Sequence, residues 1–280
     1  MRPVPVAFHI GPLVVHTYGL GLAVTFWFAY WYFERRLRRD GNPTDWVLAL
    51  LVWVVVAAVV GARGMHVLAN LGYYSSRPLQ VFAVWNGGLS SFGGLILAVP
   101  TGIAVAPRRC PALSLGRALD LVAPVLAAAW AMGRLLGPQL MVAGGGHLTH
   151  QWFGMYYAGQ AGRRLPVPIF QAMEDATIFV VLLWVERHCR RRADGTLRTG
   201  YPAGTVVGTG MVLWGIERAL DEKLWLAYPG QLGDVLVEAA GIALAVSGVI
   251  VLLVVRRRWR SSPASPPPSS VETATSEAPA

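Results

Sequence analysis

Seven long apolar runs dominate this sequence and restrict what it can fold into. Each run has about 20 residues, the length that an α-helix needs to cross about 30 Å of hydrocarbon. Only 14% of the residues are charged, against about 25% in an ordinary soluble domain. We therefore expect an all-α polytopic membrane protein with seven transmembrane helices. The predicted spans cover residues 12–33, 46–70, 87–106, 118–143, 166–185, 202–224 and 232–255.

The basic residues indicate how these spans are oriented. Sixteen of the 24 Lys and Arg residues fall in the segments that follow the first, third, fifth and last spans. Segments rich in Lys and Arg stay in the cytoplasm, so the N-terminus is expected outside and the C-terminus inside. This rule also accounts for the net charge of +9, and we expect no nucleic-acid partner.

Two regions of different composition define the predicted domain organisation. Residues 1–260 are expected to form one seven-helix transmembrane domain. Residues 261–280 are rich in Pro and Ser and hold almost no apolar side chains. Such a segment cannot bury enough apolar surface to fold, so it is predicted to be a disordered cytoplasmic tail.

Three arginines fall inside predicted spans, where a charge needs a partner or a purpose. Arg218 and Glu222 stand at i and i+4, so they can pair on one helical face, either for stability alone or for function. Arg134 has no acid one turn away on its own helix. A guanidinium beside a glycine is suited to hold the phosphate of a phospholipid headgroup. Acids near the spans that can neutralise the arginines are Glu174, Asp175, Glu217, Asp221, Glu222, Asp234 and Glu238.

A glycine-rich segment and a pair of histidines are the other candidate features. Residues 85–94 hold four glycines and two serines, which permit close approach by a neighbouring helix or by a ligand. His147 and His150 lie in a predicted outer loop that supplies no further metal ligands, so we expect no metal and no cofactor. Either histidine could still act as a base at the outer membrane face.

Several motifs together resemble the prolipoprotein diacylglyceryl transferases, which are polytopic enzymes of bacterial inner membranes. The family signature Trp-x-Gly-Gly-x-Ser-x-x-Gly-Gly is matched at residues 85–94, and Gly-x-x-Arg-x-x-x-Glu is matched at residues 215–222. Further matches lie at residues 8–13, 18–20, 61–63 and 133–134 and at Gly145. The similarity covers most of residues 8–255.

The resemblance implies a function, partners and a site. Family members transfer a diacylglyceryl group from phosphatidylglycerol to the lipobox cysteine thiol of prolipoproteins, the first step of lipoprotein maturation. The expected partners are therefore phosphatidylglycerol and prolipoprotein signal peptides, and the expected location is the bacterial inner membrane. The implied catalytic residues are Arg134, Arg218, Tyr18 and Glu222, and the implied phosphatidylglycerol-binding residues are Arg134, Arg63, Gly87, Gly93 and Gly145.

The chain also departs from the family pattern. Phe92 stands where members usually carry histidine, so the base that deprotonates the thiol is unassigned. Gly137 and Val142 replace the usual Asn and acid, and the entry to the fifth span lacks a Tyr and a Glu, with Phe170 and Gln171 in their place. A catalytically silent phospholipid-binding homologue is therefore the alternative function, and a small transporter is a third.

Overall fold

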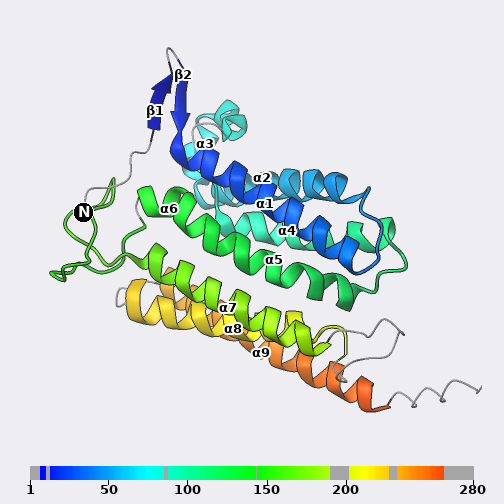
Figure 1. Ribbon diagram of the computed structural model, residues 1–280. Coiled ribbons are helices and arrows are strands. Elements are labelled where there is room, and N and C mark those ends of the chain that lie inside the picture. Colours follow the sequence, from blue (N-terminus) through cyan, green and yellow to red (C-terminus); the bar gives the residue numbers. More distant parts are fainter. Residues whose placement is uncertain are drawn as a thin grey trace, which may run out of the picture.

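The computed structural model describes residues 7–10, 13–84, 88–142, 144–189, 202–226 and 232–261. In this part of the chain the long elements are all helices, as Figure 1 shows. They are α1 (Thr17–Arg39), α2 (Val47–Ala69), α4 (Ser91–Arg109), α5 (Leu115–Leu136), α7 (Val167–Cys189), α8 (Thr205–Asp221) and α9 (Leu232–Ser261). The shorter elements are β1 (Ala7–Ile10), β2 (Leu13–His16), α3 (Leu71–Ser75), η1 (Pro78–Phe82), α6 (Pro138–Met141) and η3 (Glu222–Leu226).

The long helices lie side by side in two groups (Figure 1). Helices α1, α2, α4 and α5 form one group, in which α2 packs on α4 and α1 packs on α5. Helices α7, α8 and α9 form the other, in which α8 packs on α9. Helix α5 also contacts α7 and α8, so this junction joins the two groups.

Glycines set the closest helix contacts within each group. A Cβ atom added to Gly61 on α2 would lie 2.2 Å from the carbonyl oxygen of Gly93 on α4. A Cβ atom added to Gly215 on α8 would lie 2.5 Å from the carbonyl oxygen of Gly241 on α9. Backbones that approach this closely leave no room for a side chain, which is typical of helices that pack inside membranes.

Four of the described helical segments are long and apolar enough to cross a membrane. They are Val47–Ala69, Leu115–Met141, Val167–His188 and Asp234–Trp259. Most of their apolar surface faces outward, and only 11% of the most apolar window of Asp234–Trp259 is buried inside the protein. A helical protein with such a surface fits a membrane, and the predicted all-α class is confirmed apart from one short hairpin. A helix also lies at each of the other three predicted stretches.

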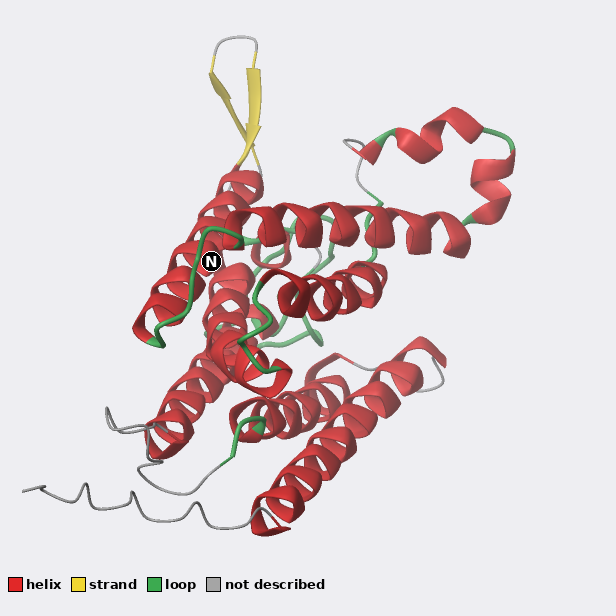
Figure 2. Cartoon of the chain, turned by 90° about the vertical axis from the view of Figure 1, so that its right-hand side faces the viewer, coloured by secondary structure: helices red, strands yellow, loops and turns green. Residues whose placement is uncertain are grey.

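Two short structures outside the long helices were not expected from the sequence. The first predicted span, residues 12–33, does not begin as a helix. Strands β1 and β2 form an antiparallel hairpin that pairs Ala7 with His16, and α1 follows directly. Between α2 and α4, helix α3 and the turn η1 project to one side of the bundle, and Figure 2 shows both projections clearly.

The basic segment that follows the first predicted span also requires a correction. It was expected in a connecting loop, but α1 continues through it to Arg39. Arg36 is only 7% exposed, and its Nη2 lies 2.8 Å from Oε1 of Glu186 on α7. Its Nε donates to the carbonyl oxygen of Leu121 at 2.8 Å. These partners satisfy the charge of Arg36 inside the bundle, where a buried charge requires them.

The predicted tail, residues 261–280, falls almost wholly outside the described residues. Ser261 is the last residue of α9, and the disordered tail stays a prediction.

Candidate active site

The candidate site lies where α5, α7 and α8 meet. Arg134 belongs to the last turn of α5, which ends because Gly137 and Pro138 follow it. Glu174 and Asp175 lie near the start of α7, and Glu217 lies near the end of α8. The three helices are in mutual contact, so these charged side chains from distant parts of the sequence meet in one place.

Arg134 makes one short hydrogen bond and one long ion pair. Its Nη1 donates to Oε1 of Gln139 at 2.6 Å. Its Nε lies 3.9 Å from Oδ2 of Asp175 and makes no hydrogen bond. A Cβ atom added to the neighbouring Gly133 would meet no atom within 4 Å, so α5 is open at this glycine. The Arg134 side chain is 20% exposed and can therefore accept a further anionic partner.

Arg218 and Glu222 pair as the i, i+4 spacing predicts. Nη2 of Arg218 donates to Oε2 of Glu222. The acid is buried, with 5% of its side chain exposed, whereas the arginine is 32% exposed. The pair lies where α8 ends and the π-turn η3 begins. Because only the guanidinium reaches the surface of the protein, Glu222 can orient it toward a ligand.

Arg63 faces a different set of partners. Its Nε donates to the carbonyl oxygen of Val81 at 2.8 Å, and its Nη1 donates to the carbonyl oxygen of Gly88 at 3.0 Å. Its Nη2 donates to the carbonyl oxygen of Gln80. These bonds fasten the projecting turn η1 to helix α2. The arginine also lines a cavity of about 410 Å³ together with His66 and Tyr74, and its predicted role in lipid binding stays a prediction.

The structure places Tyr18 on the first turn of α1, where its ring contacts that of His16 at 5.2 Å. No hydrogen bond or ion pair within the described ranges joins it to Arg134 or Arg218. Its role as a donor-pocket residue therefore stays a prediction.

The glycines of the predicted site have packing roles in this structure. Gly93 is buried against Gly61, which is the helix-packing alternative for the glycine-rich segment. Gly145 exchanges two hydrogen bonds with the side-chain amide of Gln160, and a Cβ atom there would lie 2.7 Å from the Tyr157 ring. Gly87 lies outside the described residues. Lipid binding by these glycines stays a prediction.

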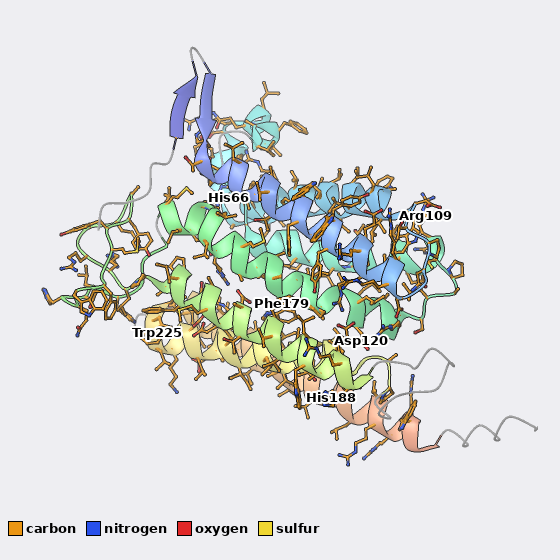
Figure 3. The ribbon with its side chains drawn as sticks, viewed as in Figure 1. His66, Arg109, Asp120, Phe179, His188 and Trp225 are labelled. Atoms are coloured by element: carbon orange, nitrogen blue, oxygen red, sulfur yellow. The ribbon has the colours of Figure 1, made fainter. Side chains whose placement is uncertain are left out.

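The loop of residues 144–166 covers one end of the bundle. His147 takes part in two backbone hydrogen bonds there, to Trp225 and Leu165. Tyr157 is 3% exposed, its hydroxyl has no hydrogen-bond partner, and burial raises its pKa to about 12. Figure 3 shows Trp225 and His66 at this end of the bundle and Asp120 and His188 toward the other.

The sequence did not predict the contacts of two buried polar side chains, because their partners are distant along the chain. Asp120 is 1% exposed, and its two carboxylate oxygens accept the backbone N–H groups of Gly204 and Val207 at 2.7 and 2.9 Å. Gln171 is 3% exposed and donates to Oδ2 of Asp221 at 2.6 Å. Both partners lie at least 50 residues away. Only the presence of an acid in an apolar stretch could have drawn attention to Asp120.

Comparison with known proteins identifies the family. The profile of the family described as prolipoprotein diacylglyceryl transferase matches residues 5–255. The chain belongs to the prolipoprotein diacylglyceryl transferase family. The matched range includes every residue of the candidate site, and the membership confirms the resemblance and the predicted class of enzyme.

Named relatives agree with this family assignment. A phosphatidylglycerol–prolipoprotein diacylglyceryl transferase from Chromohalobacter salexigens is 32% identical over 261 residues, covering 86% of this chain and 91% of the relative. One from Rhodospirillum centenum is 30% identical over 247 residues, covering 83% and 86%. One from Bacillus licheniformis is 37% identical over 130 residues, so that match spans about half of each protein, 46% and 47%. These names agree with the predicted function.

Proposed function

We propose that this diacylglyceryl transferase family member takes its diacylglyceryl group from phosphatidylglycerol and attaches it to the lipobox cysteine of prolipoprotein signal peptides. The reaction would take place at the outer side of a bacterial inner membrane. The thiolate sulfur attacks the glyceryl carbon that carries the phosphate ester, so an S–C bond forms and a C–O bond breaks. Glycerol phosphate leaves with the electron pair of the broken bond.

The observation that carries this proposal is the state of Arg134. Its one ion pair within the described residues is the long contact of 3.9 Å with Asp175, and 20% of its side chain is exposed. A partly exposed guanidinium whose terminal N–H groups no carboxylate occupies can hold a phosphodiester through paired N–H groups. Negative charge grows on the leaving phosphate in the transition state, and a fixed cation stabilises that charge.

Arg218 is the second arginine of the proposed site. Glu222 holds it from the buried side, which leaves the other face of the guanidinium for the lipid phosphate. Tyr18, Arg63, Gly87, Gly93 and Gly145 complete the proposed donor site. The thiol, with an ordinary pKa of about 8.5, must lose its proton before it attacks.

The proposed topology has seven spans, with the N-terminus outside and the C-terminus in the cytoplasm. The alternation of basic segments supports this topology. With seven spans, the four segments richest in Lys and Arg all fall on the same side of the membrane, the cytoplasmic side. Alkaline phosphatase fused after residue 261 should be inactive, and green fluorescent protein fused there should fluoresce. Active alkaline phosphatase at this position would contradict the orientation.

The proposed activity is tested with phosphatidylglycerol labelled in its acyl chains and a lipobox peptide. The purified full chain in detergent should move the label to the peptide cysteine, and a peptide with Ser in place of that Cys should stay unlabelled. The silent lipid-binding homologue is the second candidate, favoured by the replacement of polar family residues at Phe92 and Gln171. Lipid retention without label transfer would support that second candidate.

A further inference from the structure

Four acids converge beside Arg134, and the proposed lipid transfer does not use them. Glu174 and Asp175 come from α7, and Glu217 and Asp221 come from α8; we call these four residues the carboxylate cluster. One oxygen each from Glu174, Glu217 and Asp221 lie within 4.8 Å of one another. Asp175 is the member of the cluster within ion-pair distance of Arg134, with its Oδ2 3.9 Å from the arginine Nε.

Buried oxygens without partners are concentrated in the cluster. Asp221 is 1% exposed, and its Oδ1 has no hydrogen-bond partner. Asp175 is 2% exposed, and its Oδ2 has none. The cluster holds four of the seven buried side-chain atoms that lack a hydrogen bond in the described ranges. Buried polar atoms are almost always paired, so such a concentration points to shared protons or to a ligand.

Among the described residues, one arginine faces the four acids of the cluster. Arg134 is the arginine that attracts Glu174, Asp175 and Glu217, and Arg218 is paired with Glu222. Four ionised carboxylates beside one guanidinium would repel each other strongly in a medium of low dielectric constant. Further positive charge must therefore enter the cluster, either as protons or as a cation.

The donor set and its spacing favour one kind of cation. All the available ligand atoms are carboxylate oxygens, which hard divalent ions prefer. Three carboxylate oxygens that all lie within 4.8 Å of one another can be bridged by one ion of this kind. Mg²⁺ keeps several waters and is usually held by only one or two carboxylates, so a set of three protein carboxylates favours a calcium-like ion.

We propose that Glu174, Glu217 and Asp221 bind a calcium-like divalent cation inside the helical bundle, while Asp175 stays paired with Arg134. The cation satisfies the buried oxygens and balances their charge. It also weakens the attraction of the cluster for Arg134, which keeps the guanidinium available for a lipid phosphate. Binding of the cation does not require the transfer reaction, so the two proposals can fail separately.

Tb³⁺, which replaces Ca²⁺ in oxygen sites, provides a direct test because a tryptophan adjoins the cluster. Nε1 of Trp214 donates to Oδ1 of Asp175 at 3.1 Å, and the ring of Trp130 lies 5.3 Å from that of Trp214. Tb³⁺ added to the purified full chain should emit when tryptophan is excited. Excess Ca²⁺ should remove this emission, and the Glu217→Gln/Asp221→Asn double variant should bind Tb³⁺ at least tenfold more weakly.

Two further variants control for location and folding. Glu238→Gln removes an acid of α9 outside the cluster and should leave Tb³⁺ emission unchanged. Trp214→Phe should lose most of the emission and still bind Ca²⁺ in calorimetry. If the double variant is not recovered as folded protein, Glu217→Gln alone supplies the comparison. If the wild type shows neither Tb³⁺ emission nor Ca²⁺ binding, the proposal is overturned and protons, not a cation, balance the cluster. Unchanged Tb³⁺ emission in the folded cluster variants would overturn it as well.

Discussion

The most specific stability prediction concerns Asp120, which links α5 to the start of α8. Its carboxylate accepts two backbone N–H groups, from Gly204 at 2.7 Å and from Val207 at 2.9 Å. The first turn of a helix has N–H groups without partners inside the helix, and its dipole favours a negative charge. Asp120 therefore caps α8 from a helix distant in sequence, and this contact should stabilise the bundle.

The expected loss of stability follows from the number of backbone N–H groups that lose their acceptor. Asp120→Ala leaves the buried N–H group of Gly204 and the partly buried N–H group of Val207 without acceptors, at about 1–3 and about 1–2 kcal/mol, so we expect a loss of about 2–5 kcal/mol. Asp120→Asn keeps the shape and one acceptor oxygen, so it should cost about half as much. Ser114→Ala is the matched control, because Ser114 caps α5 through a single bond of 3.3 Å to the N–H group of Arg117. That change should cost about 0.5–1 kcal/mol.

Thermal unfolding in detergent, followed by tryptophan fluorescence, measures these differences. The order of stability should be wild type, Ser114→Ala, Asp120→Asn and then Asp120→Ala. At about 2–4 °C for each kcal/mol, Asp120→Ala should lower Tm by about 4–20 °C. The reasoning is refuted if Asp120→Ala is as stable as Ser114→Ala, because two N–H groups at the start of α8 would then have lost their acceptor at no cost.

Three other changes give further predictions. Gly61→Ala forces a Cβ atom to within 2.2 Å of the Gly93 carbonyl oxygen and should lower the stability of the protein by about 1–3 kcal/mol in thermal unfolding. Gly64→Ala on the same helix is the control: its Cβ atom meets open space, so this change should be neutral or stabilising. Tyr157→Phe removes a buried hydroxyl without a partner and should stabilise the protein by about 1 kcal/mol. Because the folded state raises the pKa of Tyr157 to about 12, wild-type stability should fall between pH 10 and 12 more steeply than that of Tyr157→Phe, and parallel pH profiles would contradict this. Glu222→Gln should lower the rate of label transfer about tenfold while expression and insertion stay unchanged, since Arg218 loses the charge that orients it; an unchanged rate would remove that role.

The positions of the helices could be predicted from the sequence because they depend on local patterns. Apolar runs of about 20 residues locate the helices, since a membrane span needs that length. The pairing of Arg218 with Glu222 was predictable for the same reason, because the helix itself places i and i+4 side by side. The hairpin before α1 was missed because its apolar strand residues continue the apolar run of the helix.

The long-range contacts could not be predicted from one sequence. Arg36 lies in a basic stretch that is typical of a loop, yet it pairs with Glu186, which is 150 residues away. Asp120 likewise finds its partners 84 and 87 residues away. Several acids could have neutralised Arg134, and only the packing of α5 against α7 selects Asp175. Such choices depend on how the helices pack, which local patterns do not specify.

The central claim is that Arg134 holds the phosphate of the lipid donor during transfer. The direct test is the rate at which purified Arg134→Ala moves labelled diacylglyceryl groups to a lipobox peptide, with Arg117→Ala as control. Arg117 pairs with Asp40 at the other end of α5 and has no proposed role in transfer. Arg134→Ala should lose at least about 99% of the wild-type rate, equivalent to about 2.7 kcal/mol of transition-state stabilisation, while Arg117→Ala retains it. A folded Arg134→Ala protein that transfers label as fast as the wild type would contradict the account.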